Sequence, residues 1–397
     1  MNYILFDDSS RNNLLPLTFM RPIADIRIGI LTIREKWEKY LNAETSSITE
    51  SYLAKKFPIV QSDDNILING SVCPTPEMVE IIKGLNKNET LSTDDYIIAM
   101  RVGDDIFGES EVLDPNSTNQ GIKFDKEHIK LNYTYDIFAF NADAIQQDFD
   151  LITKGRKSGK LSKTNNVIDE ENIFVEEGSV IEYATLNASN GPIYIGKYAE
   201  VMENSVIRGP FAMCEHAIVK LAAKIYGATT IGPWSKVGGE VTNCVIFGYS
   251  NKAHDGFMGN SVIAEWCNLG SDTNTSNLKN TYEPVRLWNY PEKSFKDTGL
   301  TFCGLIMGDH SKCGINTMFN TGTVVGINCN IFGAGFQRNY IPSFRWGGST
   351  GRATNYKIEK AIQVAEIVYG RRGLDFDDVE QNILKAVFDL TISNSAY

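Results

Sequence analysis

The sequence predicts an α/β unit at the N-terminus, a parallel β-helix of six-residue repeats after it, and a helical tail. Three observations lead to this prediction. Strand-like and helix-like segments alternate over residues 1–150, aliphatic residues followed by glycine recur every six positions from about residue 167, and the last segments have helical periodicity. A chain of 397 residues is also long for a single core, so several domains are expected.

The N-terminal part is expected to contain a largely parallel, doubly wound sheet, because its strands and helices alternate. The expected strands are 2–6, 65–69 and 95–101, and the expected helices are 32–41 and 76–85. Residues 153–166 (TKGRKSGKLSKTNN) are polar and basic without an apolar period, which indicates a linker. The predicted domains are therefore 1–160, 161–345 and 346–397.

The six-residue step is clearest where Met307, Cys313, Phe319, Val325 and Ile331 follow in phase. An amphipathic strand or helix has a different period, whereas a hexapeptide β-helix turns one aliphatic residue of each flat side inward. The phase is lost at 212–224 and 271–302, where we expect loops that leave the coil. Helices are expected at 355–370 and 376–390, and the first has an apolar face that would pack on a coil or a neighbouring subunit.

The composition argues against several classes of function and structure. The net charge of -11 argues against a nucleic-acid partner or an acidic membrane surface. No apolar run is long enough to span a membrane, and MNYILFDDSSR lacks the basic region of a signal peptide, so a cytoplasmic location is expected. Seven scattered cysteines without a CxxC pair suit free, mostly buried thiols and not a disulfide frame or a zinc site.

The stretch NKAHDGFMGN (251–260) carries His254, one of only four histidines. On a three-sided prism most side chains face solvent or a neighbour, so we expect His254 in a cleft. Asn268 is expected about one coil above it, and Asn277 at the start of the following loop. An imidazole with two amides can accept a proton and orient a polar substrate. The alternative is a structural histidine satisfied by backbone groups, and the residues alone leave both open.

This stretch resembles the acetyltransferase half of the bifunctional GlmU family, which acetylates glucosamine 1-phosphate and uridylylates the product. The matching positions are Lys252-Ala253-His254, Phe257, Gly259-Asn260, Asn268 before Leu269-Gly270, and Asn277 after Thr273 and Thr275. The resemblance implies a left-handed β-helix in a homotrimer that uses acetyl-CoA. It implies that His254 is the base and that Asn268 and Asn277 contact the sugar.

Two departures from the family concern the sugar phosphate. Phe257 replaces the family's tyrosine, and Thr242 stands where the family has a phosphate-binding lysine, which leaves Arg208 and Lys252 as candidate phosphate ligands. The family binds acetyl-CoA between adjacent prisms. This implies a coenzyme site over Gly314, Ile315 and Gly333, with Arg338 or Arg345 at its phosphates. The implied reaction is direct acyl transfer without a cysteine nucleophile.

Residues 11–22 (RNNLLPLTFMRP) resemble the later part of the sugar-nucleotidyltransferase pattern, and 21–37 resemble a divergent two-domain GlmU-like group. The resemblance implies UTP as substrate, Mg²⁺ as a candidate cofactor, and nucleotide contacts from Arg11, Arg21 and Asn69. However, Asp7 and Asp8 lie in the position of the phosphate-binding glycines, where carboxylates would repel phosphate. The stretch 69–74 also lacks the family's metal carboxylate, so the metal ligands are not identified.

The sequence is compatible with three functions. The first is N-acetylation of an amino-sugar 1-phosphate coupled to uridylyl transfer, which gives UDP-N-acetylglucosamine. The second is acetyl transfer alone, with an N-terminal domain that only binds nucleotide or regulates. The third is a non-catalytic trimeric scaffold, which would have no need of the His254, Asn268 and Asn277 set.

Overall fold

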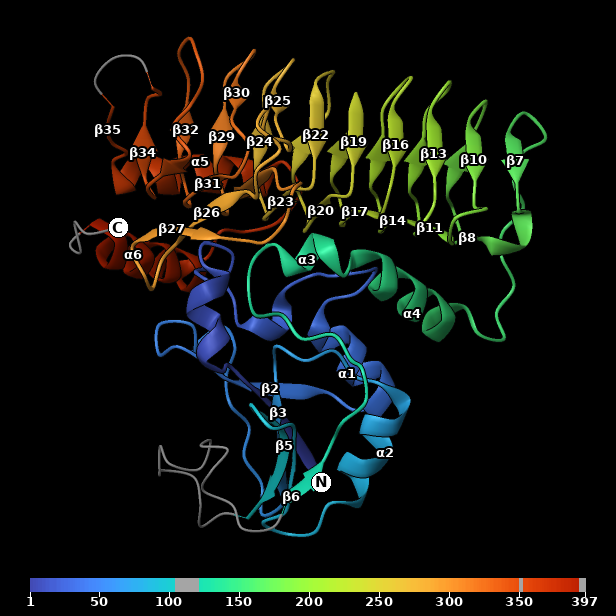
Figure 1. Ribbon diagram of the computed structural model, residues 1–397, viewed down its shortest axis with the longest axis vertical. Helices are drawn as coiled ribbons and strands as arrows, with labels where there is room; N and C mark the ends of the chain where they lie inside the picture. Colours follow the sequence, from blue (N-terminus) through green and yellow to red (C-terminus); the bar gives the residue numbers. More distant parts are fainter. Residues whose placement is uncertain (104–120, 350–352, 393–397) are drawn as a thin grey trace. The chain divides into compact units, whose positions relative to one another are not determined.

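The computed structural model describes residues 1–103, 121–349 and 353–392 (Figure 1). The chain separates into two compact units that interleave in sequence. Unit 1 comprises Met1–Leu14, Arg21–Ile26 and Leu31–Asn132, and unit 2 comprises Leu15–Met20, Arg27–Ile30 and Tyr133–Tyr397. The predicted fold class, an α/β unit with a left-handed parallel β-helix and terminal helices, is confirmed.

Unit 1 contains a sheet whose described strands have the order β2-β1-β3-β5-β4-β6. The strands are β1 (Asn2–Phe6), β2 (Thr45–Ile48), β3 (Asn65–Asn69), β4 (Thr90–Ser92), β5 (Ile97–Val102) and β6 (Gly121–Lys123). β1 runs parallel to β2 and β3, but β5 is antiparallel to β3 and β4. The expected largely parallel sheet is therefore mixed, because the short turn between β4 and β5 can join only antiparallel strands.

The helices of unit 1 begin where their capping residues predict. Helix α1 (Ile33–Leu41) starts after Thr32, which forms a reciprocal capping box with Glu35. Helix α2 (Pro76–Gly84) starts after Thr75, with proline in the first turn where no backbone N–H is needed. Two 3₁₀ helices, Ser9–Leu14 and Ile23–Asp25, occupy the segments that follow β1.

Unit 2 is a three-faced solenoid in which each coil contributes one strand to each face, and the strands of successive coils are parallel. Face 1 contains β7 (Asn166–Ile168), β10 (Thr185–Asn187), β13 (Val206–Arg208), β16 (Lys224–Tyr226), β19 (Glu240–Thr242), β22 (Phe257–Gly259), β25 (Asn274–Thr275) and β30 (Met318–Phe319). Face 2 contains β8 (Ile173–Val175), β11 (Ile193–Ile195), β14 (Phe211–Met213), β17 (Thr229–Ile231), β20 (Val245–Ile246), β23 (Val262–Ile263), β28 (Leu305–Met307), β31 (Thr323–Val325) and β33 (Tyr340–Ile341). Face 3 contains β9 (Val180–Ile181), β12 (Glu200–Val201), β15 (Ile218–Val219), β18 (Lys236–Val237), β21 (Asn251–Lys252), β24 (Asn268–Leu269), β29 (Lys312–Cys313), β32 (Asn330–Ile331) and β34 (Arg345–Trp346), with β35 (Thr354–Asn355) antiparallel at its end.

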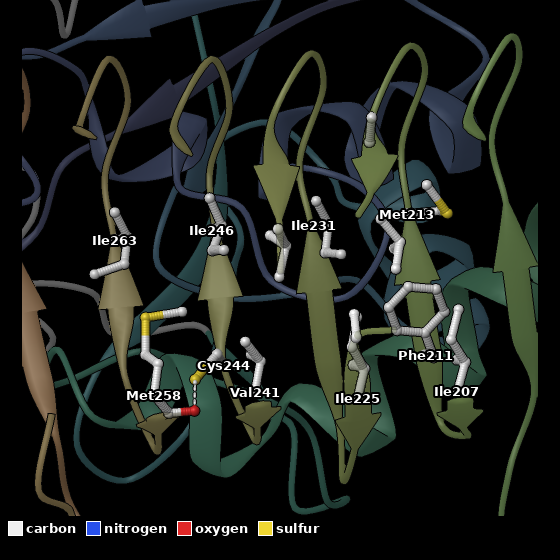
Figure 2. Close-up of a cluster of buried hydrophobic side chains, with 14 of the residues drawn as sticks. Ile207, Phe211, Met213, Ile225, Ile231, Val241, Cys244, Ile246, Met258 and Ile263 are labelled. Atoms are coloured by element: carbon white, nitrogen blue, oxygen red, sulfur yellow. Dashed lines mark hydrogen bonds between the residues drawn. The ribbon is translucent and has the colours of Figure 1, made fainter. Parts of the chain in front are cut away.

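Apolar side chains, mostly aliphatic, fill the interior of the solenoid in columns, and several strands of face 2 contribute two of them (Figure 2). Met213 and Val219 both point inward, so the coil continues through 212–224 and the loop expected there is not formed. Neither residue is followed by glycine, so the pattern of an aliphatic residue before glycine did not detect this coil. The interior position of β22 is Met258, fully buried, and not Phe257, which is only partly buried on the outer surface.

The second expected break, at 271–302, is confirmed in part. β25 still completes its coil, and the chain then leaves the solenoid until β28. The excursion contains an antiparallel hairpin formed by β26 (Arg286–Asn289) and β27 (Ser294–Asp297).

A short N-terminal segment, Arg27–Ile30, packs within unit 2 together with helices α3 (Asp136–Ala139) and α4 (Asn141–Thr153). The Thr230 hydroxyl donates to the Gly29 carbonyl (2.9 Å), and the Asp148 carboxylate accepts from the Ile30 N–H (2.8 Å). Gly29 has φ +72°, and a Cβ there would lie 2.5 Å from Asp148, so only glycine fits. These long-range contacts assign to the solenoid unit a segment that local sequence patterns place with the N-terminal strands.

The corners between faces 2 and 3 carry one aromatic residue in most coils, and we call this row the aromatic edge. Its members are Tyr198, His216, Trp234, Tyr249, Trp266, His310 and Phe344, all with positive φ. Helix α5 (Ile358–Gly370) docks here, because Tyr369 stacks on Trp266 with centroids 4.0 Å apart. Helix α6 (Asp378–Ile392) contributes Phe388, which packs edge-on against Phe344. Among the described helices, none has the length and apolar content needed to cross a membrane.

Candidate functional site

The corners between faces 3 and 1 stack into a second row, which we call the histidine edge and which comprises residues 253–256, 270–273, 314–317 and 332–335. Backbone hydrogen bonds hold successive corners together. The Asp272 N–H donates to the Asp255 carbonyl (3.1 Å), and the Asn316 N–H donates to the Ser271 carbonyl (2.8 Å). His254, Ile315 and Gly333, which are far apart in sequence, therefore lie along one edge of the solenoid.

His254 lies in the turn between β21 and β22, and its side chain is exposed. Within the described part of the chain, its imidazole forms no hydrogen bond or ion pair. The turn itself is held by a lysine ammonium group on the His254 carbonyl. The structure thus presents a fixed backbone and a free imidazole, which is what a group that exchanges protons with a substrate requires.

That lysine is Lys252, which was expected to face a sugar phosphate but points into the solenoid. Lys252 pairs in register with the interior residue Val237, and only 3% of it is exposed. Its Nζ donates to the carbonyls of Gly238 (3.0 Å) and His254 (2.6 Å). Burial lowers the pKa of Lys252 to about 8, although Asp255 acts in the opposite direction. Lys252 supports the histidine turn from inside, and its ammonium group cannot reach a ligand in solvent.

The predicted amides do not gather around His254. Asn268 is exposed on face 3 and lies in register with Asn251, so the expected stack on His254 is not formed. Asn277 lies where faces 1 and 2 meet, and its amide donates to Asn260 (2.8 Å). Phe257 lies between the two sites on the outside of face 1, with its backbone N–H held by Asn274 (2.8 Å). Face 1 therefore separates His254 from Asn277.

The other predicted ligands of unit 2 occupy separate positions. Arg208 is exposed on β13, three strands away from β22 along face 1, and does not adjoin His254. Ile315 is 71% exposed on the histidine edge, directly after Gly314. Gly333 follows β32 with φ +116°, and the exposed Arg338 lines a cavity of about 270 Å³ together with Arg345. Gly314, Ile315 and Gly333 thus lie on the histidine edge, whereas Arg338 follows face 1 before β33 and Arg345 lies on β34 of face 3.

In unit 1, the residue after β1 is Asp7, which is already paired. One carboxylate oxygen accepts from Arg11 (2.7 Å) and Thr49, and the other accepts from the Ile23 N–H (2.8 Å). Burial raises the pKa of Asp7, and Arg11 opposes this. The guanidinium of Arg11 also donates to the Arg21 carbonyl (3.1 Å), and Arg11 and Arg21 are both buried. The two arginines expected to bind triphosphate are therefore parts of an internal network.

Asp8 forms a second network at the carboxyl ends of β1 and β3. Its carboxylate accepts from Lys130 Nζ (2.9 Å), the Asn69 amide (3.0 Å) and the Ser71 hydroxyl (3.2 Å). Burial opposes ionisation of Asp8, but Lys130 and the hydrogen bonds outweigh it, so the pKa of Asp8 is lowered. Sequence reasoning missed Lys130, because its partner Asp8 lies far away in the chain, in the segment that follows β1. The predicted repulsion of phosphate by Asp7 and Asp8 is reduced, since both have cationic partners.

A metal site is not formed by the described residues, since no group of three or more His, Cys, Asp or Glu side chains is placed to hold an ion. The carboxylates of Asp7 and Asp8 are occupied by protein donors. The residues present therefore do not fit the Mg²⁺ that the resemblance implied. The seven cysteines are all free and buried, as expected, and burial raises the pKa of Cys244 to about 12.

Taken together, the two units define a class of protein in which a mixed α/β unit accompanies a three-faced β-helix with an exposed histidine on one edge. Comparison with known proteins agrees with this class. Residues 3–157 match the family model described as sugar nucleotidyl transferase. The chain is 29% identical over 233 residues to the bifunctional protein GlmU of Methanocaldococcus jannaschii. The aligned region covers 56% of this chain and 49% of the relative.

Two further comparisons concern acetyltransferases. The uncharacterized acetyltransferase YaiX of Escherichia coli O6:K15:H31 (strain 536) is 26% identical over 164 residues, which covers 41% of this chain and 68% of the relative. The solved structure of the polySia specific acetyltransferase NeuO matches 53% of this chain and 99% of its own at 13% identity, with a TM-score of 0.26. The chain spans about half the length of the GlmU relatives that it matches. The resemblance to GlmU is confirmed as sequence similarity, and it supports a GlmU-like transferase.

Proposed function

We propose that the solenoid unit transfers an acetyl group from acetyl-CoA to the amine of an amino-sugar 1-phosphate, with His254 as the general base. The observation that carries this proposal is the free, exposed imidazole of His254 on an edge that continues through Ile315 and Gly333. The similarity to GlmU and to an acetyltransferase supports the reaction class. A scaffold would need neither the free imidazole nor a buried lysine behind it.

In the proposed step, neutral His254 accepts a proton from the sugar ammonium or from the attacking amine. The amine nitrogen forms a bond to the thioester carbonyl carbon, and a backbone N–H stabilises the tetrahedral oxyanion. The C–S bond then breaks, and the proton held by His254 passes to the departing coenzyme A thiolate, while a substrate that arrives as the ammonium ion releases its additional proton to solvent. None of this uses a cysteine of the protein, which agrees with the burial of all seven.

The proposed assembly is a homotrimer, because a coenzyme beside one exposed edge needs a second wall. Ile315, Phe332 and Phe336 are exposed on and beside the histidine edge, with 71%, 44% and 57% of their surfaces accessible. A neighbouring solenoid would cover these apolar side chains and enclose the acyl group. Light scattering at micromolar concentration is expected to give three times the chain mass. A monomer would contradict both the assembly and the coenzyme position.

We further propose that unit 1 binds UTP and completes synthesis of UDP-N-acetylglucosamine, as its match to the nucleotidyl transferase family suggests. A specific observation favours the second candidate, acetyl transfer alone. Arg11 and Asn69 already bind Asp7 and Asp8, and the described residues offer no cluster of metal ligands. Under this second candidate, unit 1 binds nucleotide or regulates, and it does not catalyse uridylyl transfer.

One incubation separates these candidates. The full chain is mixed with acetyl-CoA, glucosamine 1-phosphate, UTP and Mg²⁺, and free thiol and pyrophosphate are followed separately. Both products are expected if both units are active, and thiol alone supports acetyl transfer as the sole activity. Release of neither product would contradict the proposed function and leave the scaffold alternative.

A further inference from the structure

A basic cavity of about 680 Å³ lies on the outside of face 3, where the end of helix α5 approaches strands β18 to β29. Four cationic side chains line it, Lys236 and Lys312 from the strands and Arg371 and Arg372 from the residues that follow α5. Asn251 and Asn268 lie between the two lysines on the same face. The repeat places these side chains in one outward column, because equivalent positions of successive coils lie side by side.

The four cations have no acidic partner in the part of the chain that the structure describes. Lys312 donates only to the His310 carbonyl (2.8 Å), and Arg372 donates to the Trp234 carbonyl (3.2 Å). No carboxylate lines the cavity, although acidic residues outnumber basic ones 49 to 38 in the chain. Glu215 and Glu265 act electrostatically on Tyr249 nearby, but neither is among the lining residues. Like charges gathered without counter-charges repel, so the arrangement favours an anionic ligand.

The walls of the cavity are fixed by stacked rings. Trp266 lies between Tyr249, at 4.3 Å, and Tyr369 of α5, at 4.0 Å. Arg372 lies over the ring of Trp234 at 5.8 Å. These contacts fix the aromatic wall of the cavity and the position of Arg372 before any ligand arrives, which reduces the entropy lost on binding. Lys236 and Lys312 are placed at the cavity by the register of their strands.

Two further features describe what the ligand must supply. The Asn251 Oδ1 atom is buried and has no hydrogen-bond partner among the described residues, so it can accept a hydrogen bond from a ligand hydroxyl. Burial lowers the pKa of Lys312 to about 8, so a negative charge placed beside it would stabilise its protonated form. A group with several anionic oxygens and a nearby hydroxyl meets both requirements, and a phosphate ester or a diphosphate has these atoms.

We propose that this cavity binds the phosphate or diphosphate group of a small molecule, through Lys236, Lys312, Arg371 and Arg372. The anion could be free pyrophosphate or the phosphate of a sugar ester, and the chemistry recognised is the same. Ala253, which precedes His254, also lines the cavity, so a sugar phosphate held here would lie near the histidine edge. The proposal does not depend on acetyl transfer, because binding is measured without acetyl-CoA.

The test uses the full chain, isothermal titration calorimetry in metal-free buffer, and two probes, inorganic pyrophosphate and glucosamine 1-phosphate. The Lys236→Gln/Arg371→Gln variant removes two cations whose side chains form no hydrogen bond or ion pair with the described residues, so its fold is expected to survive. The matched control is Lys224→Gln/Lys360→Gln, which also removes one strand lysine and one cation of α5, both exposed and away from the cavity.

We expect the first variant to weaken binding of at least one probe 10-fold or more, and the control to bind as the unchanged protein does. Tighter binding of pyrophosphate would identify a free diphosphate as the ligand, and tighter binding of glucosamine 1-phosphate would identify a sugar ester. Circular dichroism melting of both variants checks the fold. Equal affinities in the two variants, or no binding of either probe at millimolar concentration, would overturn the proposal.

Discussion

The ammonium group of Lys252 donates a hydrogen bond of 2.6 Å to the backbone carbonyl of His254, and it does so from inside the solenoid. The two residues face opposite sides of the same turn, since Lys252 is 3% exposed and His254 is exposed. A buried lysine is costly, because its charge leaves water. Its position directly behind the candidate base suggests that the turn of His254 needs this support.

The first prediction concerns the pH dependence that Lys252 gives to stability. Burial lowers the pKa of Lys252 to about 8 in the folded chain, against about 10.4 for an unperturbed lysine. Between these values the unfolded chain binds more protons than the folded one, so the free energy of unfolding increases as the pH rises. Below pH 8 both states carry the proton and the cost is constant. The increase across this window is about 3 kcal/mol.

In the Lys252→Met variant this increase is expected to disappear. Urea midpoints at pH 7.5, 9 and 10.5 measure it, and the variant is compared with the unchanged protein so that other titrating groups cancel. Lys224→Met is the control, because Lys224 is exposed and should leave the pH dependence as it was. Should Lys252→Met retain the full pH dependence, the lysine is not buried as described.

The second prediction concerns the ion pair of Asp8 and Lys130 in unit 1. The side chain of Asp8 is 16% exposed and that of Lys130 is 9% exposed. The Asp8 carboxylate also accepts hydrogen bonds from the Ser10 N–H, the Asn69 amide and the Ser71 hydroxyl. Lys130→Met leaves a buried carboxylate without its cation, so we expect a loss of about 3 kcal/mol. Because the pKa of Asp8 is lowered in the folded chain, its stabilising contribution is present at neutral pH and is lost as the pH falls through that folded value.

Hydrogen exchange of β1 and β3 measures the Lys130 effect within unit 1. The control is Lys123→Met, which breaks the exposed pair of Lys123 and Asp94 and should change exchange little, because solvent screens the two charges. Similar small effects from the two substitutions would show that Asp8 does not depend on Lys130.

The third prediction concerns the attachment of the helical tail. Tyr369 is 8% exposed and packs against Trp266 at 4.0 Å and Phe376 at 5.0 Å. Tyr369→Ala is expected to lower the local stability of α5 by about 3 kcal/mol, through lost burial and a cavity at the aromatic edge. Ile367→Ala is the control, because Ile367 is 59% exposed on the same helix. Hydrogen exchange should show faster exchange of α5 and α6 only in Tyr369→Ala, and unchanged exchange would mean that other contacts hold the tail.

The sequence was sufficient to predict the solenoid because a repeated coil puts equivalent residues at regular intervals. The interval is not constant, however. Met258 and Ile263 are both interior but only five positions apart, so a strict six-residue step counted back from Ile263 would place Phe257 inside in place of Met258. Lys252, which was expected as a phosphate ligand because of its charge, likewise occupies an interior position, since it pairs with Val237. Corner lengths set these shifts, and no local pattern in the sequence reports them.

The candidate site was predictable in its residue types and less so in its geometry. His254 is exposed, because corners of a prism face outward, whereas the cleft expected around it stays a prediction. The position of Asn268 over Asn251 depends on the strand register, which a motif does not contain. The place of Arg27–Ile30 in the solenoid unit, and the pairing of Asp8 with Lys130, rest on contacts between distant segments. Periodicity within a segment cannot show such contacts.

The fourth prediction distinguishes a catalytic His254 from a structural one. His254→Ala should lower acetyl transfer to glucosamine 1-phosphate by roughly 10²–10⁴-fold, the usual contribution of a general base. Its melting temperature should remain that of the unchanged protein, because the exposed ring has no hydrogen-bond partner in the described residues and fills no interior space. Removing a structural histidine would instead leave buried partners unpaired and destabilise the coil.

His216→Ala provides the matched control, because His216 also lies at a corner of the solenoid, but on the aromatic edge and away from the histidine edge. Its ring stacks on Trp234 at 4.0 Å and on Tyr198 at 5.2 Å. We expect this variant to lose about 1 kcal/mol of stability from the ring contacts and to retain its rate of acetyl transfer. The two variants should therefore show opposite effects, loss of rate with retained stability for His254 and loss of stability with retained rate for His216. If His254→Ala transfers acetyl groups at the unchanged rate, His254 is not the base and the proposed mechanism is wrong.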